Sequence, residues 1–370
     1  MPPGGAAPHR PPGDDEALDR QVASVLEHLA DADIERASVL ARQLARRYPR
    51  FALGQLLHAE LSAQAALDGT LTGSERPWSP ALIELLLEAR ARLDISTSAA
   101  SAAAAPPPPF VQLGPDLEHL VTVDLARSRL VLYAVRDGRV TPLREHYVSS
   151  GSAGFGKRRE GDRKTPLGLY RIVGYRDDEI LPERYGAGAL VLDYPNAHDR
   201  ALGRTGSGIW LHGVERARSS RGPRSSEGCV TMSNDHLLAL RARLDPATTL
   251  VMLTGHLERP SPTARAIARE RYRMLFRSWR DARAESAQAR PRALPRAPSP
   301  AALHALGGVT ANDVTILEST VDGDPGPPSL VVMTFRLGHD RLTDVTLYWT
   351  RAANGDGWTL ALEEFGGSDA

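Results

Sequence analysis

A run of alanines and prolines in the first third of the chain divides it into two kinds of sequence. Residues 96–110 are rich in alanine and contain four consecutive prolines, Pro106–Pro109. Consecutive prolines favour an extended conformation and continue neither a helix nor the interior of a sheet. The segment therefore predicts a linker between separately folded units, and a length of 370 residues fits two or three of them.

The sequence before this linker has a helical period. In residues 16–95, Leu18, Val22, Val25 and Leu29 follow one another at steps of three and four positions, which places them on one face of a helix. We expect a helical accessory domain over residues 16–95. Two interpretations stay open for it, a surface for a protein partner and a plain structural subdomain.

After the linker the apolar period changes to two, which is typical of strands. Residues 111–257 predict a mainly β domain with a short helix near its end. The expected strands are residues 119–124, 128–135, 168–173, 190–193, 208–212 and 249–253, and the expected helix is 234–244.

Residues 259–370 predict a basic amphipathic helix, a proline-rich segment at 291–300 and an antiparallel sheet with a hairpin turn at Asn354-Gly355. The expected strands are residues 314–317, 330–335, 343–349 and 357–362. A helix followed by a curved sheet resembles a small NTF2-like domain. The predicted fold class is therefore multidomain α+β.

Charge and cysteine content exclude several kinds of function. Lys plus Arg and Asp plus Glu both number 45, so there is no uniform basic field for nucleic-acid binding. Neither a secretory apolar run in the first 15 residues nor a stretch of about 18 apolar residues appears. The single cysteine, Cys229, rules out an internal disulfide and an all-cysteine zinc site, which leaves it a role in packing or in reactivity.

The surroundings of Cys229 favour reactivity. A predicted strand ends at His212-Gly213, and further along the chain Gly228 immediately precedes Cys229. A free thiol, with a pKa near ~8.5, attacks poorly at neutral pH until an imidazole or a positive charge promotes its thiolate. We therefore expect Cys229 to be a nucleophile and His212 its base, with the carbonyl of Gly213 orienting the ring. Gly228 permits a tight turn whose amides can face an oxyanion.

Two motifs in this order resemble the L,D-transpeptidase (YkuD-like) catalytic domain family. They are His212-Gly213 with Ser226-Glu227-Gly228-Cys229, and Gly161–Tyr170 upstream. The resemblance implies Cys–His acyl transfer on the third residue of a peptidoglycan tetrapeptide stem, with no metal or organic cofactor. It also implies a place in the periplasm or cell envelope, although no signal peptide is visible in the chain.

The segment from Tyr194 to Gly206 is similar to the murein peptidase-like, lipoprotein-releasing branch of this family. That similarity implies substrate contacts from Asn196, Arg200 and Arg204, and the motif adds Ser226. A guanidinium fork suits a substrate carboxylate, but both arginines fit equally well the role of pinning their loop by ion pairs.

Two departures from the family motif affect the expected reaction. Glu227 and Thr231 stand where many members carry His and Arg. Hydrolysis, by trimming of stems or by release of a wall-attached lipoprotein, therefore competes with transpeptidation as the expected reaction. A noncatalytic wall-binding scaffold is the alternative of another class.

The remaining signals are weaker. Gly151–Lys157 nearly spells a phosphate-binding loop, but Arg158 replaces the required Ser or Thr, so we expect a mobile loop beside the active groove instead. His198, His236 and His256 lack metal-ligand spacing and are expected at the surface or in packing.

Overall fold

The structure is a computed structural model, and it describes most of the chain in twelve stretches. These are residues 14–31, 33–49, 51–67, 87–88, 91–92, 110–216, 221–256, 261–288, 305–319, 329–337, 343–352 and 357–367. Except for Phe110, the predicted linker lies outside the described residues, as do the proline-rich segment at 291–300 and the predicted turn at Asn354-Gly355.

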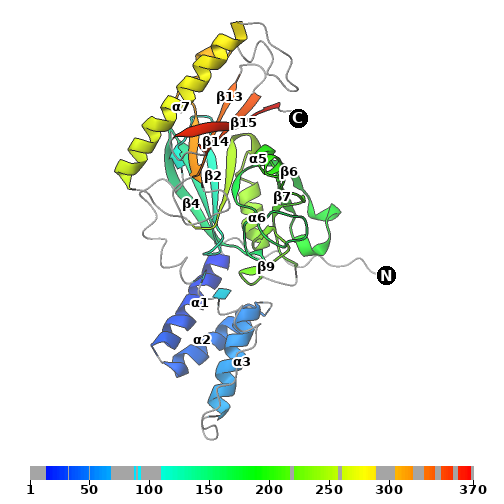
Figure 1. The fold of residues 1–370 in the computed structure, drawn as a ribbon. Helices are drawn as coiled ribbons and strands as arrows, with labels where there is room; N and C mark the ends of the chain where they lie inside the picture. Colours follow the sequence, from blue (N-terminus) through cyan, green and yellow to red (C-terminus); the bar gives the residue numbers. More distant parts are fainter. Residues whose placement is uncertain are drawn as a thin grey trace.

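Three helices form a bundle at one end of the molecule (Figure 1). They are α1 (Asp14–Ala30), α2 (Ile34–Arg47) and α3 (Ala52–Leu67). The apolar positions that predicted a helix, among them Leu18, Val22 and Val25, are buried in one cluster with Leu44. The predicted helical structure is therefore confirmed over these three helices.

An eight-stranded mixed sheet forms the centre of the molecule, with strand order β10-β8-β7-β6-β11-β2-β3-β4. We name it the catalytic sheet because it lies in the segment 111–257 that is expected to form a catalytic domain. Its strands are β2 (His119–Asp124), β3 (Arg129–Arg136), β4 (Arg139–Tyr147), β6 (Gly168–Arg176), β7 (Ala189–Leu192), β8 (Trp210–His212), β10 (Val230–Thr231) and β11 (Thr249–Thr254). Helix α6 (Asn234–Arg241) packs on its core through Leu237 and Leu240, and the short helix α5 (Ala197–Ala201) precedes β8. The strands and the short helix predicted for this part are confirmed.

Strand β4 was not expected from the sequence, because Pro142 interrupts its alternating pattern. Proline lacks the amide hydrogen that a ladder needs, so it is confined to edge strands and bulges. Here β4 is the edge strand of the sheet, and Pro142 pairs with Tyr133 where the register shifts. Pro142 therefore lies on an edge strand and beside a register shift, the two places where a sheet tolerates proline.

A second sheet, the C-terminal sheet, has five antiparallel strands in the order β1-β12-β13-β14-β15. Its strands are β1 (Phe110–Gln112), β12 (Thr315–Ser319), β13 (Leu330–Leu337), β14 (Thr343–Arg351) and β15 (Trp358–Gly367). Helix α7 (Pro262–Gln288) runs along this sheet (Figure 1) and buries Tyr272, Phe276 and Trp279 against it. The predicted helix and four strands are confirmed.

Strand β1 lies in a place that sequence order does not suggest. It stands at the start of the segment expected to form the catalytic domain, yet it pairs with β12 of the C-terminal sheet. The Gln112 amide fixes it there by donating to the carbonyls of Ala311 and Val314, each at 2.7 Å. The chain thus contributes β1 to the C-terminal sheet before it forms the first strand of the catalytic sheet.

The two sheets share an apolar core. Val131 and Met252 of the catalytic sheet pack in one buried cluster with Val332 and Tyr348 of the C-terminal sheet. Burial of apolar side chains from both sides makes separation of the sheets costly, since it would return that surface to water. The C-terminal sheet is therefore built into the same body as the catalytic sheet.

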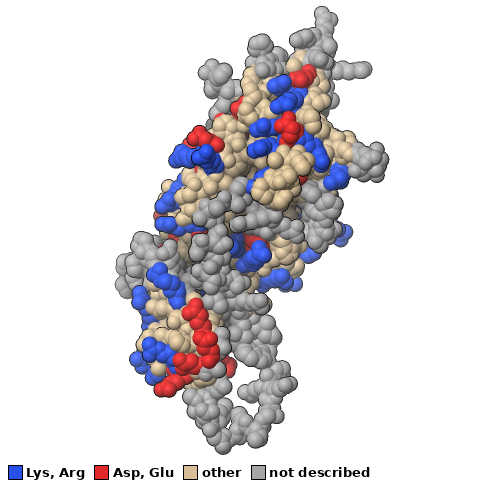
Figure 2. Space-filling view, turned by 90° about the vertical axis from the view of Figure 1, so that its left-hand side faces the viewer, with Lys and Arg blue, Asp and Glu red and all other residues tan. Residues whose placement is uncertain are grey.

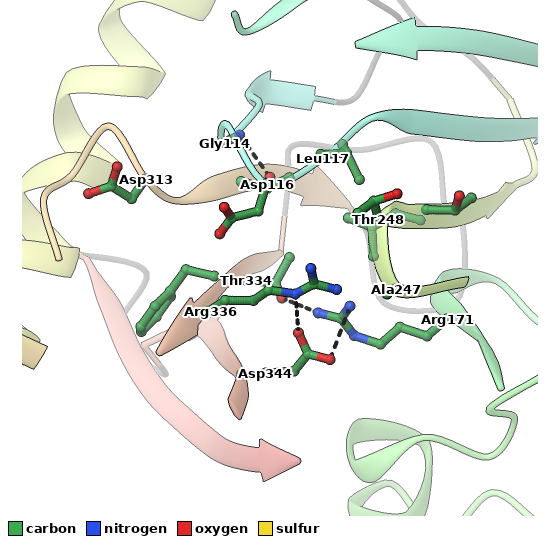
Figure 3. Close-up of a pocket in the computed structure, with 14 residues that line it drawn as sticks. Gly114, Asp116, Leu117, Arg171, Ala247, Thr248, Asp313, Thr334, Arg336 and Asp344 are labelled. Carbon is green, nitrogen blue, oxygen red and sulfur yellow. Dashed lines mark hydrogen bonds and ion pairs between the residues drawn. The ribbon is translucent and has the colours of Figure 1, made fainter. Parts of the chain in front are cut away.

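A polar rim borders this shared core (Figure 3). Arg171 on β6 donates to Thr334 at 2.7 Å and lies 3.5 Å from Asp344, which also pairs with Arg336 at 3.1 Å. The pocket among these side chains has a volume of about 30 Å³, which suits a water molecule rather than a substrate. The rim thus adds charged contacts between the sheets.

The helical bundle connects to the catalytic sheet by a different kind of contact. The guanidinium of Arg92 lies 4.5 Å from the ring centre of Tyr147 on β4 and 5.5 Å from that of Phe51 in the bundle. Glu88 pairs with it at 3.0 Å, and both side chains are buried. One cation between two aromatic rings therefore links the bundle to the sheet.

The surface mixes both signs of charge. On the face shown in Figure 2, Lys and Arg side chains are interspersed with Asp and Glu, in keeping with the balanced composition. None of the described helices combines the length and apolar character needed to cross a membrane.

Candidate active site

Two adjacent parallel strands bring His212 and Cys229 to one face of the catalytic sheet. Strand β10 pairs with β8 so that Val230 lies opposite Leu211 and Thr231 opposite His212. Leu211 and Val230 are buried in the main core, and because side chains alternate along a strand, His212 and Cys229 point to the other face. Cys229 immediately precedes β10, so it is a diagonal neighbour of His212 on that face.

His212 is held in one ring orientation. It is 3% exposed, and its Nδ1 lies 2.6 Å from the carbonyl oxygen of Gly213. A carbonyl only accepts, so Nδ1 carries the proton and Nε2 is left with a lone pair. Burial is the main reason why the pKa of His212 falls to about 4. The ring is therefore neutral at pH 7 and able to accept a proton.

Gly213 makes the expected orienting contact, and only glycine fits its position. A Cβ there would collide with the side-chain oxygen of Asn234 and lie 2.9 Å from the amide nitrogen of Ala187. Asn234 accepts from that amide at 2.8 Å and donates to the carbonyl of Val214 at 3.0 Å. The segment that follows His212 is thereby tied to the start of α6.

The Cys229 thiol is partly buried, and it donates to the carbonyl of Gly208 at 3.2 Å. Burial raises the pKa of Cys229, whereas a hydrogen bond with the backbone of Trp210 and the charge of Arg221 lower it. In the resting protein the group is thus a thiol that needs a base and positive charge to become a nucleophile.

The turn before Cys229 depends on Gly228 and Ser226. Gly228 has a φ of +130°, and a Cβ there would lie 2.8 Å from the carbonyl of Lys164. Ser226 is buried, and its hydroxyl donates to the carbonyl of Cys229 at 2.6 Å and accepts from the Gly228 amide at 3.1 Å. Two expectations need correction, because Ser226 stabilises this turn rather than facing a substrate, and the Gly228 amide is already bonded rather than open to an oxyanion.

The three residues expected upstream as substrate contacts are part of the architecture. Asn196 caps α5 by accepting from the Asp199 amide at 3.0 Å, and its own amide donates to Leu169 at 3.0 Å. Arg204 forms a buried ion pair with Asp199 at 2.7 Å, and Arg200 lies 3.5 Å from Glu364 on β15. For both arginines the structure therefore agrees with the loop-pinning interpretation.

Three residues that sequence reasoning did not select form a series of contacts that begins at His212. The Tyr185 ring meets that of His212 edge-on, with centres 4.9 Å apart. Arg184 is exposed and donates to the Tyr185 hydroxyl at 3.2 Å, and Arg221 donates to the Arg184 carbonyl at 3.1 Å. Tyr185 ends a short 3₁₀ turn (Glu183–Tyr185) and Arg221 lies in a loop, so neither has a periodic pattern that could have revealed it.

The two residues that depart from the family motif differ in exposure. Glu227 is exposed, and its charge acts to raise the pKa of Cys229. Thr231 is 1% exposed and stands in β10 opposite His212. Glu227 thus opposes thiolate formation, where a histidine would not.

The lysine of the loop that resembles a phosphate-binding motif is held inside the protein. Lys157 is buried, and its ammonium pairs with Asp162 at 2.8 Å. The Lys157 ammonium is therefore already neutralised by a carboxylate, which disfavours its use for binding a phosphate. Among the described residues, no three His, Cys, Asp or Glu side chains are grouped to hold a metal ion.

The three other histidines that the sequence singled out, His198, His236 and His256, lie in packing contacts or at the surface. His198 is buried and stacks on Tyr348 with ring centres 4.9 Å apart, whereas His256 is exposed. His236 lies on α6, its ring centre 3.9 Å from that of buried His146 on β4. These positions agree with the expected packing and surface roles.

Comparison with known proteins finds the same family. Residues 118–252 match the L,D-transpeptidase catalytic domain (YkuD) family. Over 106 residues the chain is 30% identical to the "Putative L,D-transpeptidase YafK" of Escherichia coli strain K12, which is 28% of this chain and 38% of that protein. The chain thus matches well under half of the length of this relative.

Solved structures align over more of the chain. The structure of Bdellovibrio bacteriovorus Bd1075 aligns with a TM-score of 0.53 at 21% identity, covering 71% of this chain and 98% of that one. The helical cell shape determining protein Pgp2 from Campylobacter jejuni aligns with a TM-score of 0.49 at 18% identity, covering 69% and 94%. By its motifs, its fold and the family match, the segment 118–252 of this chain belongs to the YkuD family of L,D-transpeptidase catalytic domains.

Proposed function

We propose that the protein is a peptidoglycan-remodelling cysteine enzyme, an L,D-transpeptidase that acts on stem-peptide bonds through an acyl-enzyme. The observation that carries this proposal is the pair formed by Cys229 and His212 on one face of the sheet, with Nδ1 of His212 bound to the Gly213 carbonyl at 2.6 Å. That bond leaves Nε2 as the proton acceptor, which is the arrangement a thiol nucleophile requires.

In the proposed cycle, Nε2 of His212 takes the proton of the Cys229 thiol, and the sulfur attacks the carbonyl carbon of a stem-peptide bond. The tetrahedral intermediate collapses as the C–N bond breaks, and His212 returns the proton to the leaving amine. Since the Gly228 amide already donates to Ser226, the amide of Cys229 itself is the better candidate for an oxyanion donor. An amine of a second stem, or water, then releases the acyl group and regenerates the thiol.

The proposal extends to the place of action and to the other parts of the chain. Stem peptides lie in the bacterial envelope, so we place the protein there, in the periplasm. We take residues 259–370 as an NTF2-like unit because α7 packs along one curved antiparallel sheet. The N-terminal helices remain a candidate surface for a protein partner.

The test is mass spectrometry of purified tetrapeptide muropeptides incubated with the protein, with and without an amine acceptor. We expect loss of the fourth residue with formation of a new amide when the acceptor is present. Gain of water instead would assign a stem-trimming hydrolase, and release of peptidoglycan from a lipoprotein-linked substrate would assign the lipoprotein-releasing activity.

Variants separate catalysis from folding in this test. Cys229→Ala removes the nucleophile and should abolish every product, and His212→Gln should reduce the rate by about 10²–10⁴-fold. His256→Gln, a change at an exposed histidine outside the pair, is the matched control and should retain wild-type turnover. If Cys229→Ala yields the same products as the wild type, Cys229 is not the nucleophile and the proposal fails, whereas the absence of any product from the folded wild type would support the scaffold alternative.

A further inference from the structure

Arg221 is fixed by contacts at both its side chain and its backbone. Its guanidinium donates to both carboxylate oxygens of Glu215, at 3.1 and 2.8 Å, and to the carbonyl of Arg184 at 3.1 Å. Its own carbonyl accepts from the Tyr147 hydroxyl at 2.9 Å. The side chain is 14% exposed, so the charge is held in one place instead of moving in solvent.

These contacts tie the guanidinium to two segments that border His212. Glu215 follows closely after the Gly213 carbonyl that orients His212, and Arg184 precedes Tyr185, whose ring lies against His212. On the other side, the chain runs from Arg221 through β9 (Arg224–Ser226) directly into the turn at Cys229. Arg221 therefore bridges the wall behind His212 and the loop that carries the thiol.

Several charges face the thiol and the imidazole, and they do not act equally. Arg221 and Lys157 favour the thiolate of Cys229, whereas Glu227 opposes it. Arg221 and Arg184 disfavour a second proton on His212, and Glu215 favours one. The charge of Lys157 affects Cys229 less than that of Arg221 does, and Arg184 is exposed to solvent, which screens its charge. Of these cations, Arg221 is the one whose charge acts on both reacting groups, and its side chain is held in place by Glu215.

We propose that Arg221 is a positioning residue for this reaction, which places a fixed positive charge beside the Cys229 sulfur and holds the Arg184–Tyr185 wall against His212. It offsets the exposed carboxylate of Glu227, which stands where a histidine is common in the family. The inference rests on the proposed function only in taking Cys229 as the nucleophile.

The consequence is a thiolate that forms at lower pH while the imidazole stays neutral. A fixed cation stabilises the negative sulfur and opposes protonation of His212, so it acts to lower the pKa of both groups. An opposite charge within a few Å lowers the pKa of a partner by about 1–3 units, and less where a carboxylate shares the cation. Because Glu215 shares Arg221, we take the lower end of this range.

The experiment measures the rate at which iodoacetamide alkylates the full-length protein between pH 5 and 10. The sulfur displaces iodide only as the thiolate, and the chain has a single cysteine, so the rate reports on Cys229 alone. Arg221→Met and Arg221→Gln remove the charge, and both should move the midpoint of the profile up by about one pH unit. Alkylation at pH 7 should then be about tenfold slower, since one unit of pKa is a factor of ten in thiolate.

Two further variants identify the cause. Arg221→Lys keeps the charge without the two-point contact to Glu215, so its midpoint should lie between those of the wild type and Arg221→Met. Arg336→Met is the matched control, because Arg336 is also 14% exposed and paired with an aspartate but lies on β13 of the C-terminal sheet. Its profile should coincide with that of the wild type.

An unchanged midpoint in either neutral Arg221 variant would overturn the proposal, as would equal shifts in Arg221→Lys and Arg221→Met. Near-ultraviolet circular dichroism checks the fold of each variant, and Arg221→Gln, which retains a hydrogen-bond donor toward Glu215, decides the matter if Arg221→Met does not fold. The outcome is distinguishable from the muropeptide test. A shifted midpoint without turnover leaves the role of Arg221 intact and refutes the substrate, and turnover without a shift refutes Arg221 alone.

Discussion

The C-terminal sheet and the N-terminal helices are both attached to the catalytic sheet, but by contacts of different character. The C-terminal sheet contributes Val332 and Tyr348 to a buried apolar cluster that also contains Val131 and Met252. The helices are linked through the buried Arg92, which lies over Tyr147 of β4. Apolar burial scales with area, whereas a cation over a ring adds about 0.5–2 kcal/mol. The attachment of the C-terminal sheet is therefore part of the fold, whereas the attachment of the N-terminal helices is separable from it.

The largest expected effect comes from cutting into the shared core with Tyr348→Ala. Tyr348 is 5% exposed and stacks on His198 of the catalytic part, so truncation leaves a cavity between the sheets. We expect the free energy of unfolding to fall by about 3–5 kcal/mol, with both sheets still unfolding in one transition, as measured by urea denaturation.

Tyr348→Phe is the control for this change. It keeps the ring in place, so it should cost less than about 1.5 kcal/mol. Two separate transitions in Tyr348→Ala, with the catalytic part unfolding at the wild-type urea concentration, would break the comparison, because the C-terminal sheet would then be an independent appendage.

Sequence reasoning identified what depends on local pattern. Alternation of apolar residues marked β2, β3 and β13, and the spacing of Leu18 and Val22 marked α1. Cys229 stands out because it is the single cysteine and follows a glycine, and His212 stands out because a glycine follows it at the end of a predicted strand. These are features that a short stretch of chain determines by itself.

The contacts that close the fold could not be read in the same way. The placement of β1 beside β12 depends on residues some 200 positions apart, such as Gln112 and Ala311. Asn196 and Arg204 were candidates for substrate contact, with loop pinning as the open alternative for Arg204, and a buried aspartate, Asp199, bonds with both of them. Arg221 carries no local pattern, because its partners Arg184 and Tyr147 are distant in the sequence and are brought to it only when the chain folds.

A smaller effect is expected at the helical attachment. The double variant Glu88→Leu with Arg92→Leu removes the buried ion pair together with the cation between Phe51 and Tyr147. Removing both partners leaves no buried charge unpaired, so the loss should be about 1–2 kcal/mol and confined to the helices. Hydrogen exchange should quicken in α1, α2 and α3 and stay unchanged in β2, β3 and β11.

Arg47→Leu serves as the matched change within the same bundle. Arg47 is exposed and lies over the ring of Tyr48 at 5.5 Å, so it has the same chemistry away from the sheet, and its loss should cost no more than about 1 kcal/mol. Faster exchange in β2, β3 and β11 of the double variant would mean that the helices support the catalytic sheet and are not separable from it.

The last effect is a change of stability with pH at the C-terminal interface, and it separates the polar from the apolar part of that attachment. Asp193 accepts from the Arg171 amide at 2.9 Å, and burial, reinforced by the charge of Glu364, raises its pKa from 3.8 to about 7. Between pH 4 and 7 the folded protein therefore keeps a proton on Asp193, whereas the unfolded chain has already released it. The contribution of this group to stability is complete below pH 4 and is lost as pH rises through 7.

Asp193→Asn removes this titration, so its stability relative to the wild type should rise with pH by at most about 1.4 kcal/mol for each unit up to pH 7 and then level off. His212, whose lowered pKa makes stability increase from about pH 4 to 6.5, affects both proteins equally and cancels in the difference. Urea denaturation at several pH values between 5 and 8 measures that difference, and Tyr348→Phe, at the same interface, should run parallel to the wild type over this range. A difference between Asp193→Asn and wild type that does not vary with pH would mean that Asp193 stays ionised in the folded protein and that the interface with the C-terminal sheet is held by its apolar core alone.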